Sequence, residues 1–297
     1  MKMGAARIGS ALALLIALPP AFAGETLDRI AKTGKVVIAN REASIPFSYV
    51  ADGHPIGYSI DICRGIVEGI KAALKRPDLR VEFFQVTSDT RIPAIKDGKA
   101  DLECGSTTNN AERRKQVGFT IPHFIAGSRM LVRADSGIKN WVDLRDKTIV
   151  TTKGTTNAKT IMARNDVRSL NIKLIEAEDH SRSYEMVQNR SADAFAMDDV
   201  LLFGLRAAAT KPTDFAVVGD LLSVEPYSVM FSKTDFALKA IVDKEMARLI
   251  DNGEIAKLYE KWFMRPIPPK NANLGMPMSA LLRDSLRYPS DKVADGF

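Results

Sequence analysis

The stretch of sequence that decides the fold passes from an apolar segment through a polar loop into a helix: Ala100-Asp101-Leu102-Glu103-Cys104-Gly105-Ser106-Thr107-Thr108-Asn109-Asn110-Ala111-Glu112-Arg113. Residues 100–104 predict a buried strand, and the loop after them offers hydroxyl groups and free backbone amides. Asn109 suits the N-cap of the helix, with Glu112 three residues later as its capping partner. The stretch therefore predicts a joint of strand, loop and helix.

The same joint is a candidate anion site. Free amide groups at the start of a helix favour a negative charge, and Arg113 can hold a carboxylate through two parallel hydrogen bonds. The alternative is an ordinary connection that carries a solvated arginine. This stretch alone does not decide between the two, so the rest of the chain has to.

The composition is that of a soluble globular protein with two domains or one large one. The chain has 297 residues, of which 45% are hydrophobic and 26% are charged. Its net charge of +6 is spread along the sequence. A nucleic-acid-binding protein would show clustered basic residues with interleaved aromatics, so we expect no nucleic-acid partner.

Residues 1–23 have the features of a cleaved signal peptide. Lys2 and Arg7 precede an apolar run, and Ala21 and Ala23 form the small-x-small pattern that a signal peptidase reads. The run is too short for a permanent membrane helix, and no cysteine stands at the cleavage point to carry a lipid anchor. We therefore expect the mature protein to be exported and soluble.

The mature chain has two cysteines, Cys63 and Cys104. In an oxidising compartment they can form one disulfide that closes a loop of about 40 residues and stabilises the fold by roughly 3–4 kcal/mol. The alternative is two buried thiols that behave as small apolar side chains. The sequence does not decide between them, although we slightly favour the thiols.

Strands alternate with helices through the first part of the mature chain. A helix that contains Leu27 and Ile30 ends at Gly34, and further helices are predicted around residues 62–74 and 92–95. Strands are predicted at residues 35–40, 81–86 and 100–104. This alternation is typical of a parallel sheet that is covered on both faces.

A second block after Phe119 repeats the pattern, with strands predicted at residues 147–152, 172–175 and 192–197. The same order of elements occurs twice. Near residue 100 a predicted helix is followed by Gly-Lys-Ala-Asp and a strand, and near residue 192 a predicted helix is followed by Arg-Ser-Ala-Asp and a strand. The sequence therefore predicts two α/β lobes of one architecture. The remaining predictions are strands at 125–132 and 227–232, a helical region at 239–263 interrupted at Asn252-Gly253, and an extended proline-rich tail from Pro266.

Polar residues gather where the predicted strands end, which is where open α/β sheets bind ligands. Three arginines describe a receptor for more than one carboxylate, and Asp198 complements an ammonium group. Hydroxyl groups fill the other hydrogen-bonding positions, so the set fits an acidic amino acid. The set comprises Arg41, Ser88, Arg91, Ser106, Thr108, Arg113, Thr155, Thr156, His180 and Asp198.

Each of these residues also has a purely structural explanation. A single arginine is more often a surface charge than a ligand clamp, and His180, Asp198 or Asp199 could cap a helix. Phe47 and Tyr49 could be core residues or a lid over the ligand. Only the residues taken together therefore indicate a binding site.

Catalytic motifs are missing from the sequence. It contains no GxSxG elbow, no HExxH, no Cys–His metal spacing and no phosphate-binding glycine loop. Cys104 lies beside the proposed site, but no nearby residue in the sequence can serve as its base. We therefore expect a binding protein without a cofactor or metal.

Several of these motifs closely resemble the periplasmic glutamate/aspartate-binding proteins of ABC transporters. The resemblance covers almost the entire mature chain, and the sequence departs from the family pattern at residues 225–229, near the second crossover between lobes. The matching motifs are the stretch 103–113, Asn40-Arg41-Glu42-x-Ser44-x-Pro46-Phe47-Ser48-Tyr49, Gly154-Thr155-Thr156, Asp179-His180, Met197-Asp198-Asp199, Lys261-Trp262-Phe263 and Pro266-Ile267-Pro268-Pro269-Lys270-Asn271.

The resemblance implies a two-lobe, type II periplasmic binding fold that closes on its ligand about a two-strand hinge. Residues 24–127 and 226–297 would form the first lobe, and residues 128–225 the second. It implies a monomer that delivers L-glutamate or L-aspartate to an inner-membrane ABC permease. The implied ligand-binding residues are Arg41, Ser88, Arg91, Ser106, Thr108, Arg113, Thr156, His180 and Asp198.

The resemblance also implies a role for each group. Arg113 and Thr156 would hold the α-carboxylate and Asp198 the ammonium, whereas Arg41 and Arg91, with Ser88 and His180, would hold the side-chain carboxylate. The rival interpretation is an enzyme on the same fold, such as a dehydratase or a murein-cleaving protein. Glutamate and aspartate differ by one methylene, so the sequence does not rank them.

Overall fold

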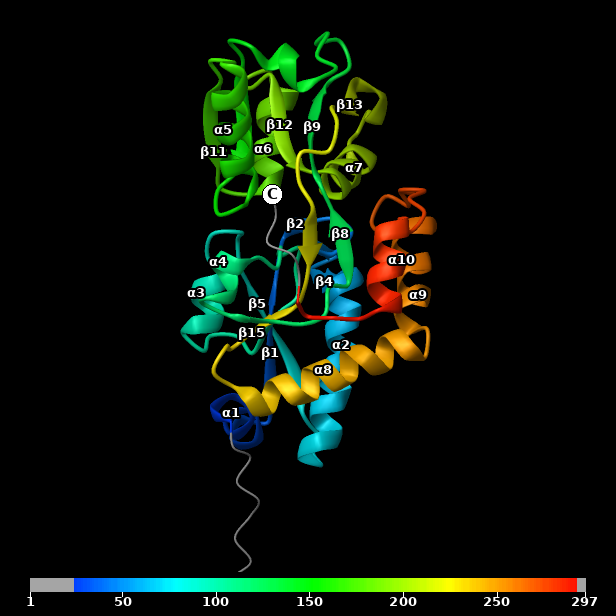
Figure 1. The fold of residues 1–297 in the computed structure, drawn as a ribbon. Helices are drawn as coiled ribbons and strands as arrows, with labels where there is room; N and C mark the ends of the chain where they lie inside the picture. The colour runs from blue at the N-terminus through cyan, green and yellow to red at the C-terminus, as the bar shows by residue number, and fades with distance from the viewer. Residues whose placement is uncertain (1–23, 293–297) are drawn as a thin grey trace, which may run out of the picture.

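Two five-stranded sheets form the cores of two lobes, one above the other in Figure 1. The structure is a computed structural model and describes residues 24–292; the predicted signal peptide lies outside the described residues. None of the helices in residues 24–292 is long and apolar enough to cross a membrane. The chain forms one lobe, crosses to the second, and returns to complete the first.

The first lobe is built on a mostly parallel sheet in the order β5-β1-β6-β15-β7. Strands β5 and β6 pair in parallel with β1, and β15 runs antiparallel between β6 and β7. The strands are β1 (Lys35–Asn40), β5 (Arg80–Gln85), β6 (Leu102–Glu103), β7 (Gly118–Phe119) and β15 (Met230–Phe231). A separate antiparallel sheet contains β2 (Ala43–Ser44), β3 (Ser48–Ala51) and β4 (His54–Ile56).

The helices of the first lobe largely match the sequence predictions. The first helix ends at Gly34, whose left-handed φ of 70° is the geometry that favours glycine after a helix. The interruption predicted at Asn252-Gly253 separates α8 from α9. The helices are α1 (Glu25–Thr33), α2 (Tyr58–Leu74), α3 (Arg91–Lys96), α4 (Ala111–Arg114), α8 (Phe236–Asp251), α9 (Glu254–Tyr259), a π-helical turn at Glu260–Met264, and α10 (Ala280–Arg287).

The second lobe has a sheet in the order β11-β10-β12-β9-β13. Its first three strands are parallel and β9 pairs antiparallel with both neighbours. The elements are β9 (Ser128–Arg133), β10 (Thr148–Thr152), α5 (Asn157–Arg168), β11 (Lys173–Ala177), α6 (His180–Gln188), β12 (Ala194–Asp198), α7 (Asp199–Ala208) and β13 (Phe215–Val218), with 3-10 turns at Trp141–Leu144 and Pro212–Asp214.

Two antiparallel strands, β8 (Phe124–Ala126) and β14 (Glu225–Tyr227), run between the lobes (Figure 1). The sequence predicted single strands at 125–132 and 227–232, and both predictions are wrong because each run divides between two sheets. The first run breaks at Gly127, where a Cβ would lie 2.6 Å from the Ser223 carbonyl oxygen. The chain changes sheets there because only glycine allows this close approach of the two crossing segments.

Three local predictions need correction. The N-cap of α4 is Asn110 and not Asn109, since the Asn110 side chain accepts a hydrogen bond from the Arg113 amide, and the helix is a single turn. Of the predicted strand at 100–104, only Leu102–Glu103 enters the ladder. The tail is not wholly extended, because Leu282 is buried and α10 lies against β8.

An aromatic cluster packs beside the two crossing strands. The ring of Phe47 is fully buried, and its centroid lies 4.9 Å from that of Phe124, 5.1 Å from Tyr227 and 5.6 Å from Phe263. Tyr49 is also buried and donates to the Pro268 carbonyl oxygen. Phe47 and Tyr49 are therefore core residues, and the lid alternative is excluded.

Candidate functional site

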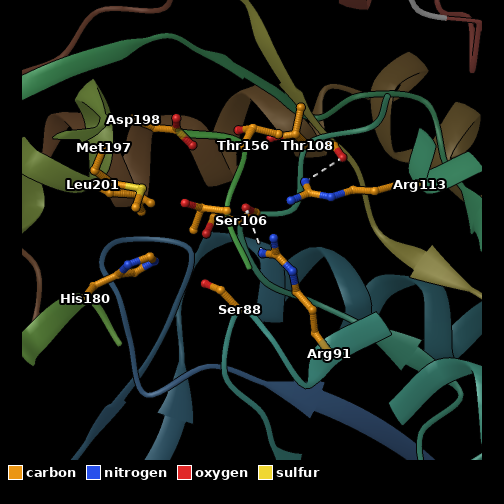
Figure 2. Close-up of a pocket in the computed structure, with 11 residues that line it drawn as sticks. Ser88, Arg91, Ser106, Thr108, Arg113, Thr156, His180, Met197, Asp198 and Leu201 are labelled. Carbon is orange, nitrogen blue, oxygen red and sulfur yellow. Dashed lines mark hydrogen bonds between the residues drawn. The ribbon is translucent and has the colours of Figure 1, made fainter. Parts of the chain in front are cut away.

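A cavity lies between the lobes, at the carboxyl ends of the parallel strands of both sheets. About 210 Å³ among its lining residues is free of protein atoms, a volume that includes space open to solvent. Figure 2 shows arginine side chains on one side and Asp198 and His180 on the other. The cavity is lined by Ser88, Arg91, Ser106, Thr108, Arg113, Thr155, Thr156, His180, Met197, Asp198 and Leu201.

Arg91 and Arg113 form the cationic wall on the first lobe. Arg91 begins α3 and Arg113 lies on α4, and both side chains are buried. The Nη1 of Arg91 donates to the Ser106 carbonyl oxygen at 3.4 Å, and that of Arg113 to the Thr108 carbonyl oxygen at 3.0 Å (Figure 2). These contacts with backbone carbonyls hold both guanidinium groups at the cavity without neutralising them.

Burial lowers the pKa of Arg91, and burial followed by repulsion from Arg91 lowers the pKa of Arg113 to about 9. Both groups stay charged at neutral pH, but they pay a desolvation cost that a bound anion would offset. A carboxylate is the natural partner, because each guanidinium can offer it two parallel N–H donors.

Arg41 does not line this cavity but contacts two residues that do. Its Nη2 donates to Ser88 Oγ at 2.6 Å and lies 3.5 Å from His180 Nε2. Burial, and then Arg91, lower its pKa to about 9, and its Nε and Nη1 have no hydrogen-bond partner. Arg41 instead lines a second cavity, with Glu42, Glu178 and Asp179, which shares His180 with the first. Arg41 therefore acts on the first cavity through Ser88 and His180.

His180 is the first residue of α6, whose cap is the neighbouring Asp179: the Asp179 Oδ1 accepts a hydrogen bond from the Arg182 amide. The His180 Nδ1 lies 2.8 Å from Thr152 Oγ1. Burial, and then Arg41 and Arg91, lower the pKa of His180 well below its usual range, so the imidazole is neutral near pH 7. A neutral ring between the Thr152 hydroxyl and Arg41 is suited to hydrogen bonding with a ligand.

Asp198 provides the carboxylate of the second lobe. It ends β12, and its Oδ1 accepts a hydrogen bond from Asn157 Nδ2 at 3.0 Å while Oδ2 accepts one from the Tyr227 hydroxyl. Burial, and then the charge of Glu225, raise the pKa of Asp198 to about 7. A cation in the cavity would stabilise the ionised carboxylate, as an ammonium group does. Asp199 points elsewhere and accepts from the amides of Gly127 and Val200.

Eight of the nine predicted ligand-binding residues line one cavity, and Arg41 reaches it through two of them. Three polar residues that were not predicted form hydrogen bonds to the lining residues Thr156 and Asp198: Glu225 and Tyr227 on β14, and Asn157 at the start of α5. Residues 225–229 stood out in the sequence only as a departure from the family pattern. Their position next to the cavity could not be predicted from the sequence, because it depends on where the returning strand β14 crosses between the lobes.

The two cysteines form a disulfide, so our preference for two free thiols is wrong. Cys63 on α2 is bonded to Cys104, with the Cα atoms 6.3 Å apart and both residues fully buried. The bond fixes the residue that directly precedes Gly105-Ser106 of the site. It also removes Cys104 as a nucleophile.

Comparisons with known proteins agree with this geometry. The model of the family described as bacterial extracellular solute-binding proteins, family 3, matches residues 36–265. The L-glutamate/L-aspartate-binding protein of Pseudomonas aeruginosa is 42% identical over 300 residues, which cover 99% of each chain. The glutamate/aspartate import solute-binding protein of Escherichia coli is 42% identical over 272 residues, covering 91% of this chain and 90% of the relative.

Solved structures show the same architecture. The cysteine-binding protein from Campylobacter jejuni superposes with a TM-score of 0.69 at 27% identity, covering 80% of this chain and 92% of that one. The expected two-lobe, type II periplasmic binding fold is thus confirmed. Both relatives are named as binding proteins, and the Escherichia coli one as a protein of import, which supports a binding protein over an enzyme. Because the family model matches residues 36–265 and the Pseudomonas aeruginosa relative aligns along nearly the whole chain, this chain belongs to the bacterial extracellular solute-binding proteins, family 3.

Proposed function

We propose that this protein captures L-glutamate or L-aspartate between its lobes in the periplasm and delivers it, as a monomer, to an ABC-type amino-acid permease. The observation that carries the proposal is the arrangement of charge around the cavity: Arg91 and Arg113 on one wall face Asp198 on the other. Two cations and one anion, all buried, complement a ligand with two carboxylates and one ammonium. The acidic amino acids named for its relatives have that composition.

The proposed binding mode assigns one end of the ligand to each group of side chains. Arg113 and Thr156 hold the α-carboxylate and Asp198 holds the ammonium. Arg91 and Ser88 hold the side-chain carboxylate together with His180. Ser106 and Thr108 supply further hydrogen bonds from the first lobe, and Arg41 supports the distal end from behind Ser88. Each charge-assisted hydrogen bond contributes ~1.5–3 kcal/mol, so four or five contribute roughly 6–15 kcal/mol, a range that includes the ~8 kcal/mol of micromolar binding.

We also propose how the chain divides between the lobes. Residues 24–127 and 226–297 belong to the first lobe and residues 128–225 to the second. The pairing of β8 with β14 supports this division, because the chain crosses between the sheets at these two strands. Closure then brings Thr156 and Asp198 to the arginines, and the ligand favours the closed state because it bridges both walls.

Thermal unfolding with a panel of amino acids tests the ligand class. At 1 mM, L-glutamate or L-aspartate should raise the Tm by several degrees, because a ligand at ~1,000 times its Kd adds about 4 kcal/mol. L-glutamine and L-arginine should shift it less. Mass spectrometry after incubation should recover the ligand unchanged. A Tm shift with neutral or basic amino acids only would contradict the proposed ligand, and chemical conversion would indicate an enzyme.

A further inference from the structure

Glu225 is a second buried carboxylate beside the cavity: it does not line the cavity as Asp198 does, but it contacts the lining residue Thr156. It is 4% exposed and lies on β14, two residues before Tyr227. Its Oε2 accepts a hydrogen bond from the Thr156 Oγ1 at 3.0 Å. Glu225 therefore controls the hydroxyl of a residue that the proposed binding mode places on the ligand's α-carboxylate.

A threonine hydroxyl has one hydrogen to donate. While Glu225 is ionised it can only accept, so it occupies the Thr156 hydrogen that the α-carboxylate would need. A protonated Glu225 reverses this bond: its O–H donates to Thr156 Oγ1, and the Thr156 hydroxyl turns its own hydrogen to the ligand. Protonation also removes the repulsion between Glu225 and an arriving carboxylate.

Asp198 is in the opposite situation. Asn157 and Tyr227 both donate to its carboxylate, which stabilises the charged form. An ammonium group arriving at Asp198 stabilises that charge further. Within one site, the ligand therefore favours an ionised Asp198 and a neutral Glu225.

The balance of buried charge points the same way. Three cations, Arg41, Arg91 and Arg113, face three carboxylates, Glu103, Asp198 and Glu225, and all six side chains are buried. The charge of Glu103 raises the pKa of all three arginines, and the charges of Asp198 and Glu225 raise that of Arg113. An acidic amino acid adds one net negative charge. Uptake of one proton restores neutrality, which lowers the cost of burying the complex.

We propose that Glu225 carries a proton when the cavity holds an amino acid and donates it to Thr156 Oγ1, whereas Asp198 stays ionised for the ammonium group. Ligand binding is then linked to proton uptake. The proposal rests on the proposed binding mode of the α-amino and α-carboxylate groups, which any amino acid has; the argument from net charge adds to it for an acidic ligand. Glu225 is thus a positioning residue that acts through Thr156.

The titratable groups around Asp198 and Glu225 determine at which pH ligand binding takes up a proton. His180 is kept neutral by burial and by Arg41 and Arg91, and Tyr227 keeps its proton because burial and Asp198 raise its pKa well above the usual range. The pKa of Asp198 is raised to about 7. Below pH 7 Asp198 already holds a proton in the free protein, and the proposed bound state is reached when this proton moves to Glu225. Above pH 7 Asp198 has lost that proton, so the proposed bound state is reached by taking one up from solvent.

Calorimetry in buffers of different ionisation enthalpy measures this uptake. Wild-type protein should take up close to one proton per L-glutamate at pH 8 and much less at pH 6, and its Kd should rise about tenfold per pH unit above pH 7.5. In Glu225→Gln the uptake at pH 8 should fall to near zero. The Gln amide can donate to Thr156 Oγ1 as a protonated Glu225 does, so this variant should bind about tenfold more tightly at pH 8 than Glu225→Ala. Glu178→Gln removes an exposed carboxylate near the cleft and should keep the wild-type uptake.

The outcomes separate this inference from the proposed ligand. If L-glutamate and L-aspartate give no heat, the proposed function fails, and the same buffers are applied to whichever amino acid binds. Without any ligand, a carbon-13 NMR titration should show the Asp198 carboxyl titrating at lower pH in Glu225→Gln than in wild type, with no change in Glu178→Gln. Buffer-independent heat at pH 8, uptake unchanged in Glu225→Gln, or an Asp198 titration that ignores this substitution would overturn the inference.

Discussion

The backbone of Gly154 on the second lobe lies so close to that of Asp89 on the first that a Cβ at Gly154 would stand 2.6 Å from the Asp89 Cα. The φ of Gly154 is +76°, a left-handed conformation that other residues rarely adopt. The Nη2 atoms of Arg91 and Arg113 both donate to the Gly154 carbonyl oxygen, at 3.4 and 3.2 Å. The arginines of the proposed site thus also hold the lobes together.

Gly154→Ala should prevent full closure, because the added methyl meets backbone atoms of Ser88 and Asp89 that have no freedom to move aside. We expect the Kd for L-glutamate to rise at least about tenfold, since the methyl disfavours only the closed state, which the ligand must stabilise to bind. Small-angle scattering with saturating ligand should show a larger radius of gyration than for wild type.

Gly137→Ala is the matched control for that experiment. Gly137 has a similar φ of +74° in the second lobe but no atom within 4 Å of its Cβ position. The Gly137→Ala variant therefore measures the effect of an alanine in the left-handed conformation without a contact between the lobes. Equal losses of affinity in the two variants would show that closure at Gly154 is not responsible.

The two cavity arginines should affect selectivity differently. Arg113→Lys loses bidentate contact with the α-carboxylate, which every amino acid has, so affinity for L-glutamate and L-glutamine should fall alike, by about 10–100-fold. Arg91→Lys should weaken L-glutamate more than L-glutamine, because only L-glutamate has the second carboxylate. Calorimetry with both ligands measures the ratio, and the assignment of the two arginines fails if Arg113→Lys is the variant that changes it.

The disulfide should contribute substantially to stability. Cys63 and Cys104 are 41 residues apart, and closing such a loop in the unfolded chain corresponds to roughly 3–4 kcal/mol. Urea unfolding of the Cys63→Ser/Cys104→Ser variant should show that loss in the free energy of unfolding. Reduction of the wild type with dithiothreitol should give a similar loss and leave the double variant unchanged. A reductant-insensitive wild type would contradict the pairing.

Folding stability should fall in mild acid because of a buried histidine. His123 is fully buried, and burial lowers its pKa to about 3. The unfolded chain binds a proton at this residue below about pH 6.5 and the folded chain does not, so each pH unit below that costs ~1.4 kcal/mol until the pH reaches the folded value. Urea unfolding at several pH values should give a flatter profile for His123→Gln, whereas His54→Gln, at an exposed position, should follow the wild type.

Much of the site was predictable because it depends on local order along the chain. Arg91 and Ser106 each follow a strand and Asp198 ends one, and the carboxyl ends of parallel strands meet at one edge of a sheet. The alternation of strands and helices therefore placed these residues together before any distance was known. The same periodicity located β1 and α2.

The parts that escaped prediction depend on contacts between distant segments. Glu225 and Tyr227 reach Thr156 and Asp198 only because the chain returns through β14, and no local pattern encodes that crossing. The disulfide likewise requires that α2 and the loop after β6 pack together. Asn109 and Asn110 are both suitable N-caps for α4, and the sequence does not show which of the two takes that position.

Calorimetric titration of unfolded-and-refolded, ligand-free protein with L-glutamate, L-aspartate, L-glutamine and L-arginine tests the central claim most directly. The account predicts one site per chain, micromolar or tighter binding of at least one acidic amino acid, and at least about tenfold weaker binding of the other two. Absence of heat with both acidic amino acids at sub-millimolar concentration, together with binding of L-glutamine or L-arginine, would contradict it.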